Sequence, residues 1–359
     1  MKKSKVFFKR LKDSEDETSI NNSLQRIIKK TSILDFIKEN DFTGIKMHLG
    51  EKGNEGYIRS GWIKSLINSL NQKTKNLFIT DANVLYRSGS RWNSVGHLKI
   101  AYEHGFDAGN LGIPIIISDG IMGRSYRNMP IHGKHFKEVK IASDYFDIDS
   151  LVCLAHVTGH MYTSIAASIK NIGMGCASRA GKLEQHSSAT PDVSVSDCTG
   201  CGLCVRCCPE NAISVKDGKA VIDANICVGC GECTVICRYD AIKISWSEKV
   251  ENLQEKMVEY AYGITQLFGD KIVFFNFLIN ITKDCDCLSE KVKKIAPDIG
   301  ILASGDPVAI DRASLDLVNE AGKTDIFKVG YPNIDWAGQF RYAEEIGLGS
   351  TQYDLTEID

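Results

Sequence analysis

Two stretches of the sequence carry the same spacing of cysteines, and these cysteines are the residues best suited to chemistry in this chain. Residues 198–215 read Cys-Thr-Gly-Cys-Gly-Leu-Cys-Val-Arg-Cys-Cys-Pro-Glu-Asn-Ala-Ile-Ser-Val, and residues 227–244 repeat the pattern 29 positions later. Each stretch contains the spacing Cys-x2-Cys-x2-Cys-x3-Cys. Three closely spaced thiolates bind three corners of an iron–sulfur cubane, and the fourth thiolate reaches the other cluster. The spacing therefore predicts two [4Fe–4S] clusters.

The ligand sets of the two clusters are expected to interlock. One cluster should be bound by Cys198, Cys201, Cys204 and Cys237, and the other by Cys227, Cys230, Cys233 and Cys208. Cys207 aligns with Ile236 of the second repeat, so we expect it to be a spare thiol. Zinc or free thiols are the alternative interpretation, but zinc sites use four ligands without an interlocked repeat.

Composition excludes several other functions. The chain of 359 residues is 43% hydrophobic and 25% charged, with 13 cysteines and a net charge of −2. This balance lacks the basic surface that nucleic acids or anionic membranes attract. The apolar run near the start is too short for a signal peptide, and the longest one, residues 272–281, is too short to span a bilayer. We expect a cytoplasmic protein with no nucleic-acid or membrane partner.

The elements that must position these residues alternate between strands and helices. Apolar runs predict strands at Lys5–Lys9, Gly44–Leu49, Asn76–Thr80, Ile113–Ser118, Leu151–Val157, Lys271–Leu278 and Ile299–Ala303. Apolar residues at helical spacing predict helices at Ser19–Lys38, Ser60–Leu70, Ser94–His104, Val250–Phe268 and Pro307–Glu320. This alternation predicts an α/β fold with a mainly parallel sheet and flanking helices. We expect residues 1–191 and 247–359 to form it, interrupted by an inserted α+β two-cluster ferredoxin-like domain at residues 192–246.

Polar side chains follow several of the predicted strands. The carboxyl ends of parallel strands share one rim, which is where such sheets bind ligands. His48, Asp81, Asp119, His156, His160, Cys285 and Cys287 are expected at or near that rim, and Asp306 follows another strand. Each also has a structural interpretation: Asp306 precedes Pro307 and fits a helix N-cap, Asp81 and Asp119 fit turns or caps, and single histidines are often structural.

Two lysines flank a glycine-rich stretch, residues 173–181. Lys170 and Lys182 do not complete a phosphate-binding loop, because the spacing is wrong and Leu183 stands where serine or threonine is needed. Either the lysines hold an anion, or the stretch ends a helix and leaves them solvated. With the histidines His48, His156 and His160 and the carboxylate of Asp81, they are the candidate catalytic residues.

A third site, holding a metal or a reactive thiol, is expected around Cys285 and Cys287. A Cys-x-Cys pair in an extended segment points both sulfurs to one side. The neighbouring Asp284 and Asp286 would raise the thiol pKa unless a cation compensates. Candidate further ligands are Cys176, His156, His160 and His186. The alternative is a pair of inert loop thiols.

Nearly the whole chain, including the cysteine-rich block, resembles the iron–sulfur-centre proteins that carry domain of unknown function 362. The stretches that carry the resemblance are Ile45-Lys-Met-His-Leu-Gly-Glu, Thr80-Asp-Ala-Asn-Val-Leu-Tyr, His156-Val-Thr-Gly-His, Ile169-Lys-Asn-Ile-Gly-Met-Gly-Cys-Ala-Ser-Arg-Ala-Gly-Lys, Asp284-Cys-Asp-Cys and Ile301-Leu-Ala-Ser-Gly-Asp-Pro-Val-Ala-Ile-Asp. The resemblance implies an iron–sulfur redox protein and names no reaction.

Together these features favour a reductase-like enzyme. Electrons from a low-potential donor such as ferredoxin or flavodoxin would enter the two clusters and pass to a small-molecule substrate or a metal at the rim. The alternatives are a non-catalytic electron carrier, a cluster-dependent regulator, or an enzyme whose clusters are structural. No Gly-x-Gly-x-x-Gly follows a predicted strand, which disfavours a nicotinamide site, and the sequence leaves flavin binding open.

Overall fold

An eight-stranded sheet forms the centre of the computed structural model, which describes residues 3–86, 89–186, 190–227, 231–243, 248–289 and 291–359. The strand order is β16-β1-β15-β14-β7-β2-β3-β4. Within the described residues β15 alone runs against the other seven strands, so the predicted mainly parallel sheet is confirmed. The strands are β1 (Ser4–Arg10), β2 (Phe42–Met47), β3 (Asn76–Asp81), β4 (Ile115–Ile117), β7 (Ser150–His156), β14 (Ile272–Leu278), β15 (Gly300–Ser304) and β16 (Tyr353–Glu357).

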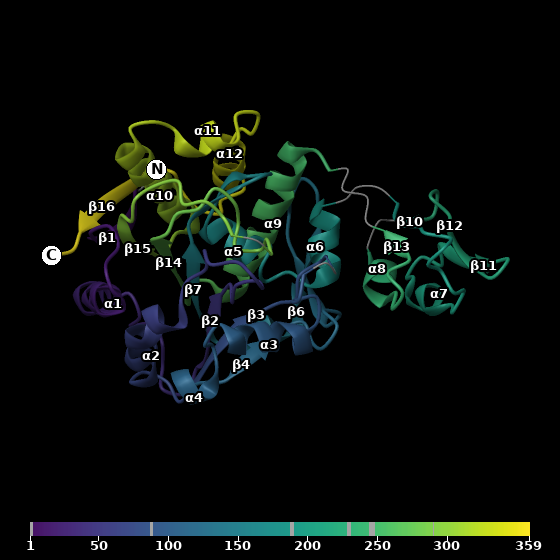
Figure 1. Cartoon of the computed structure of the whole chain (residues 1–359), viewed down its shortest axis with the longest axis horizontal. Helices are drawn as coiled ribbons and strands as arrows, with labels where there is room; N and C mark the ends of the chain where they lie inside the picture. Colours follow the sequence, from purple (N-terminus) through teal and green to yellow (C-terminus); the bar gives the residue numbers. More distant parts are fainter. Residues whose placement is uncertain (1–2, 87–88, 187–189, 228–230, 244–247, 290) are drawn as a thin grey trace.

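Helices cover both faces of this sheet (Figure 1). Side chains alternate between the faces of a strand, so Phe274 of β14 packs into one hydrophobic core while Phe275 and Phe277 pack into the other. One face carries α1 (Glu17–Thr31), α2 (Lys64–Asn71) and α3 (Ser94–Glu103). The other carries α5 (Ser168–Gly173), α9 (Val250–Phe268), α10 (Pro307–Gly322) and α12 (Ala337–Glu345).

Most predicted elements are present, with shifts at their ends. The helix predicted at Ser19–Lys38 ends at Thr31, because Ser32 takes a left-handed conformation (φ 53°) that closes it. Several short elements were not predicted. In the main body they are the hairpin of β5 (Tyr126–Pro130) and β6 (Glu138–Ala142), the pair β8 (Thr158–His160) and β9 (Ser164–Ala166), the 3-10 helix Ser143–Asp147, the helices α4 (Ala108–Leu111), α5, α6 (Arg179–His186), α11 (Ile326–Gly330) and α12, and the strand β16.

The cysteine-rich segment lies to one side of the sheet, next to α6 (Figure 1). It contains the helices α7 (Leu203–Cys207) and α8 (Glu232–Ile236), the strand pair β10 (Asp192–Val193) and β13 (Ile242–Lys243), and the hairpin β11 (Ile213–Lys216) and β12 (Lys219–Ile222). These elements surround a small core of their own, built largely from cysteine, alanine and isoleucine. The main-body elements α6 and α9 precede and follow the segment. We refer to residues 192–246 as the cysteine module.

Removing the cysteine module and bridging the gap with a short Gly/Ser linker should leave a folded α/β body. The expectation rests on the two hydrophobic cores of the body, which contain no module residue. Cooperative urea unfolding with retained near-ultraviolet circular dichroism would be the supporting result. A deletion variant that lacks a cooperative transition would show that the module is part of the folding unit.

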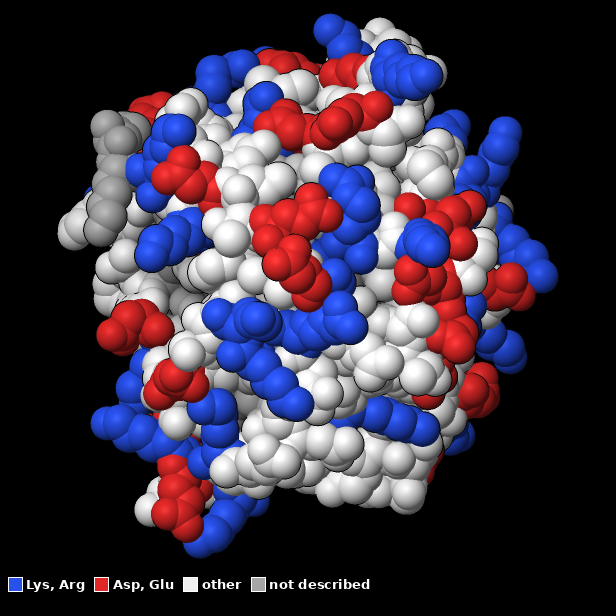
Figure 2. Space-filling model, turned by 90° about the vertical axis from the view of Figure 1, so that its left-hand side faces the viewer, with Lys and Arg blue, Asp and Glu red and all other residues white. Residues whose placement is uncertain are grey.

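The surface is of mixed charge, and none of the helices in the described ranges is long and apolar enough to cross a membrane. Figure 2 shows acidic and basic side chains interspersed over the face that carries β1 and β16. Such mixing agrees with the net charge of −2.

Candidate functional site

The cysteines of the two repeats gather around two small cavities in the module. One cavity is lined by Cys198, Cys201, Cys204 and Cys237, and the other by Cys208, Cys227 and Cys233. In each case the last cysteine of one repeat joins the first cysteines of the other, which is the arrangement that the spacing predicts. Cys230, the remaining predicted ligand, lies outside the described residues. We call these cavities the outer (Cys198) and inner (Cys208) cysteine cavities.

Backbone amides point at the sulfurs of both cavities. The N–H of Ala212 donates to Cys208 Sγ (3.2 Å), and the repeat-equivalent Ala241 donates to Cys237 Sγ (3.3 Å). The amides of Ala220 and Gly200 lower the pKa of Cys198. Such donors stabilise thiolates and the anionic sulfurs of a bound cluster. Cys207 lines neither cavity and donates to the carbonyl oxygen of Cys204 (3.3 Å), as a spare thiol would.

The second repeat, not the first, packs against the main body. Val235 and Thr234 of α8 are buried, whereas the equivalent Arg206 of α7 is exposed and Val205 is half-buried. A Cβ added at Gly231, which precedes α8, would lie 2.0 Å from Leu183 of α6. The Tyr126 hydroxyl of β5 donates a hydrogen bond to the Glu232 carboxylate of α8. Burial raises the pKa of Glu232 and outweighs this hydrogen bond, which lowers that pKa. The inner cysteine cavity therefore lies beside α6.

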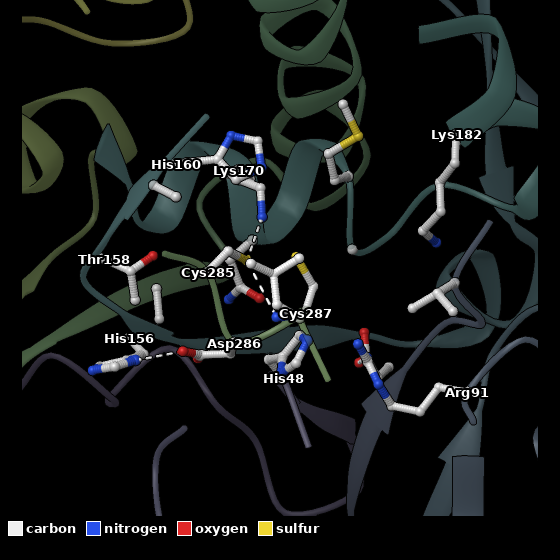
Figure 3. Close-up of a pocket in the computed structure, with 18 of the residues that line it drawn as sticks. His48, Arg91, His156, Thr158, His160, Lys170, Lys182, Cys285, Asp286 and Cys287 are labelled. Carbon is white, nitrogen blue, oxygen red and sulfur yellow. Dashed lines mark hydrogen bonds and ion pairs between the residues drawn. The ribbon is translucent and has the colours of Figure 1, made fainter. Parts of the chain in front are cut away.

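A cavity of about 620 Å³ opens at the carboxyl ends of β2, β3, β7 and β14. Because these strands are parallel, residues that are distant in sequence meet at this edge. Of the residues singled out from the sequence, the cavity is lined by Asp81 and His186 and by His48, His156, His160, Lys170, Lys182, Cys285 and Cys287. The last seven are labelled in Figure 3.

Three other candidates lie elsewhere. Asp119 is buried and accepts hydrogen bonds from the backbone (3.0 Å) and side-chain (2.7 Å) nitrogens of Asn83, so it anchors a loop. Asp306 follows β15, whose reversed direction places it at the opposite edge, where it caps α10 as expected. Cys176 is fully buried beside Tyr145, and burial raises its pKa to about 11.

Buried charges form one wall of the cavity. Lys46 Nζ lies 3.1 Å from Asp81 Oδ1, and Arg91 pairs with Glu51 (3.1 Å) and lies 3.8 Å from Asp81. Burial would raise the pKa of Asp81, but the charge of Lys46 and the His97 ring, whose Nε2 lies 3.5 Å from Asp81 Oδ2, hold it well below its usual range. Asp81 therefore stays ionised and balances the cations, which argues against a role as a general base.

Two buried donors on this wall have no hydrogen-bond partner among the described residues: His48 Nε2 and Arg91 Nη2. His48 Nδ1 accepts the Gly50 N–H (3.0 Å), so the neutral ring carries its proton on Nε2. Across the cavity, burial lowers the pKa of Lys182 to about 8, despite the nearby charges of Asp119 and Asp81. A buried donor without a hydrogen-bond partner destabilises the fold, so His48 Nε2 and Arg91 Nη2 suit an anionic ligand.

The Cys-x-Cys segment is a turn, not the extended segment that we expected. The Leu288 N–H bonds the Cys285 carbonyl oxygen (3.2 Å), and the Cys287 N–H donates to Cys285 Sγ (3.4 Å). The two sulfurs lie close together because the turn folds the chain back on itself. Their proximity was expected, but it does not arise from the alternation of side chains along an extended segment. Together with His160 these sulfurs form the one group of three or more metal-ligand atoms in the described residues that all lie within 4.8 Å of one another.

The acidic neighbours of these cysteines are already engaged. Asp286 pairs with His156 Nδ1 (2.8 Å), and the Tyr331 hydroxyl bonds Asp284. His156 Nε2 in turn faces the carbonyl oxygen of Ile279 (2.8 Å). With an acceptor at each ring nitrogen, His156 has no lone pair to offer, so the expectation that it ligates a metal does not fit this geometry. Lys170 Nζ lies 3.0 Å from Cys285 Sγ and supplies a cation beside the thiols.

The family described as "Domain of unknown function (DUF362)" matches residues 43–316, which is most of the chain. The chain belongs to the DUF362 family. The matched region takes in the cysteine module and all of the residues named on the cavity wall. No curated protein matches this DUF362 chain in sequence.

Two solved structures show a weak likeness to this DUF362 protein. One is the crystal structure of a protein from Thermotoga maritima (TM-score 0.41, 10% identity), with 87% of this chain aligned to 59% of that one. The other is the lactate racemase apoprotein from Thermoanaerobacterium thermosaccharolyticum (TM-score 0.42, 11% identity), with 76% of this chain aligned to 50% of that one. This chain thus spans between half and three fifths of the length of these proteins, and likenesses at these scores carry no functional argument.

Sequence reasoning missed Lys46, Glu51 and Arg91. Lys46 did leave a signal, since a lysine stands between Ile45 and Met47 in the predicted strand, and buried strands accept a charge only with a partner. Nothing in the sequence distinguishes Arg91 from the other arginines.

Proposed function

We propose that this protein is an iron–sulfur redox enzyme that passes low-potential electrons from two [4Fe–4S] clusters to a small anionic substrate in the 620 Å³ cavity. The observation that carries the proposal is the position of α6. This helix contacts the second cysteine repeat through Leu183, and its Lys182 and His186 line the cavity. A single helix therefore separates the inner cysteine cavity from the candidate active site.

The two clusters are supported by the lining of the two cysteine cavities and by the amides directed at their sulfurs. The first cluster would be held by Cys198, Cys201, Cys204 and Cys237, and the second by Cys227, Cys230, Cys233 and Cys208. Each cluster carries one electron, so the module would store the pair that most organic reductions need.

The arrangement suggests a direction for the electrons. Cys201, on the outer cavity, is exposed to solvent, so a donor such as reduced ferredoxin or flavodoxin would deliver electrons there. The inner cluster, beside α6, would pass them to the cavity. A non-catalytic carrier needs no such pocket, and a cavity with a wall of buried charges beside the module therefore favours the enzyme.

The proposed substrate class follows from the cavity wall. His48 Nε2–H and Arg91 Nη2 would bind an anionic group such as a carboxylate, because both are buried donors without partners in the described part of the chain. Lys182, with its pKa lowered to about 8, would supply a proton near neutral pH. Two electrons from the clusters, one proton from Lys182 and one proton from solvent would balance the reduction of one substrate double bond.

Anaerobic purification provides the test. We expect about eight irons and about eight sulfides per chain, as two [4Fe–4S] clusters require. Reduction by dithionite should give the electron paramagnetic resonance signal of two interacting four-iron centres. Zinc without acid-labile sulfide would contradict the proposal, and so would a reduced protein that shows no paramagnetic signal.

A further inference from the structure

We propose that His160, Cys285 and Cys287 bind a single divalent transition-metal ion, with one coordination position left open toward the cavity. This inference shares its cavity with the proposed function, but it concerns ligands outside the cysteine module. The metal would be a third centre, independent of the two clusters.

The ligand atoms are held together before any metal binds. His160, Cys285 and Cys287 each offer one atom, and these atoms lie within 4.8 Å of one another. The turn of Cys285–Leu288 fixes the two sulfurs relative to each other. The Tyr86 hydroxyl bonds the Cys287 carbonyl oxygen (2.5 Å), which ties the turn to the loop after β3. Little ordering would therefore be needed on binding.

The local charges suit two thiolates. Lys170 donates to Cys285 Sγ (3.0 Å), and donors of this kind orient a metal ligand and stabilise its charge. Asp286 would repel the thiolates, but its carboxylate is turned toward His156 and pairs with that ring (Figure 3). The Asp284 carboxylate is held by Tyr331. The carboxylates that flank the cysteines in sequence are thus bound to other partners and do not occupy the position where the metal would bind.

The donor set identifies the class of metal. Thiolate and imidazole together favour zinc, nickel, iron or copper over magnesium or calcium. Three protein ligands and one open position are typical of catalytic zinc sites, whereas structural sites close all four positions. Within the described residues the neighbouring histidines do not close the fourth position: His156 is engaged at both ring nitrogens, and His186 is not part of the group of ligand atoms that lie within 4.8 Å of one another.

The open position would accept the substrate. His160, Cys285 and Cys287 line the same cavity as Arg91 and His48, whose buried donors have no partner in the described residues. An anionic oxygen bound by these donors could complete the coordination of the ion. The ion would then act as a Lewis acid and orient the group to be reduced.

The test uses the full chain, purified anaerobically with its clusters and equilibrated with zinc. We expect about one zinc per chain in addition to the cluster iron, by mass spectrometric metal analysis. Zinc-edge X-ray absorption, which ignores iron, should report two sulfur ligands and at least one nitrogen ligand. The double variant Cys285→Ser/Cys287→Ser should lose this zinc, and His160→Gln should weaken its binding at least about tenfold.

Cys153→Ser is the matched control, because Cys153 is a buried cysteine of β7 that does not line the cavity. It should keep the zinc. Zinc that persists in the double variant, or that shows no sulfur ligand, would overturn the proposal. Iron, sulfide and paramagnetic signals are measured on the same samples. If those fail while zinc binds as expected, the proposed function is wrong and the metal site stands; the reverse pattern removes only the metal site.

Discussion

Replacing Cys208 by serine should destroy the cluster proposed for Cys227 and Cys233 and leave the cluster proposed for its own sequence neighbours intact. Cys208 lines the inner cysteine cavity with Cys227 and Cys233, and not the outer one with Cys198. Loss of one thiolate ligand exposes a cubane to breakdown, so iron should fall from about eight to about four per chain.

Alkylation followed by mass spectrometry identifies the cluster that is lost. In Cys208→Ser the thiols of Cys227 and Cys233 should become reactive, while those of Cys198 and Cys204 stay protected. Cys237→Ser is the matched counterpart and should give the opposite pattern. Cys207→Ser should change neither, because Cys207 lines neither cavity. Exposure of Cys198 in Cys208→Ser would mean that each repeat binds its own cluster, and the interlocked assignment would be wrong.

Replacing Gly231 by alanine should loosen the module from the main body, whereas the same change at Gly202 should not. The two glycines are repeat equivalents with nearly equal backbone conformations, φ 70° at Gly202 and φ 75° at Gly231. Alanine at either position carries the same left-handed strain, roughly 1–2 kcal/mol. The surroundings differ: a Cβ at Gly231 would lie 2.0 Å from Leu183, and one at Gly202 would meet nothing within 4 Å.

Hydrogen exchange of α6 measures this difference. Exchange of the α6 amides should become about tenfold faster in Gly231→Ala, which corresponds to about 1.4 kcal/mol of lost protection, and should stay unchanged in Gly202→Ala. Iron content is determined for both variants, so that loss of a cluster is not mistaken for loosening. Equal exchange in the two variants, with both clusters present, would contradict the contact between the second repeat and α6. The electron route proposed through that contact would then lose its support.

The sequence predicts elements well where one physical signal dominates. Hydrophobic periodicity placed α9 at Val250–Phe268, the bounds that the structure has. It carries no strand direction, so the reversal of β15 and the resulting position of Asp306 could not be predicted. The meeting of His48, Asp81 and His156 at one edge was predictable, because it needs only that their strands be parallel.

Features that depend on tertiary contacts were beyond the sequence. The two cysteine repeats have the same cysteine spacing. A difference that indicates which repeat packs on the body lies at equivalent positions of the two helices, where α7 has the exposed Arg206 and α8 has the buried Val235. The pairing of His156 with Asp286 joins residues from distant segments, and it overturned the metal-ligand role expected for that histidine. The turn at Cys285 depends on backbone conformations that local composition did not reveal.

The reversed strand β15 also bears on how this site could change over evolutionary time. Antiparallel neighbours such as β14 and β15 can be joined by a two-residue turn. Here the connection runs from residue 279 to residue 299 and carries Cys285, Asp286 and Cys287 to the cavity. The entropy of closing such a loop grows only with the logarithm of its length, so lengthening it costs little. New chemistry could therefore be introduced in this connection while the sheet, its register and the cysteine module are inherited unchanged.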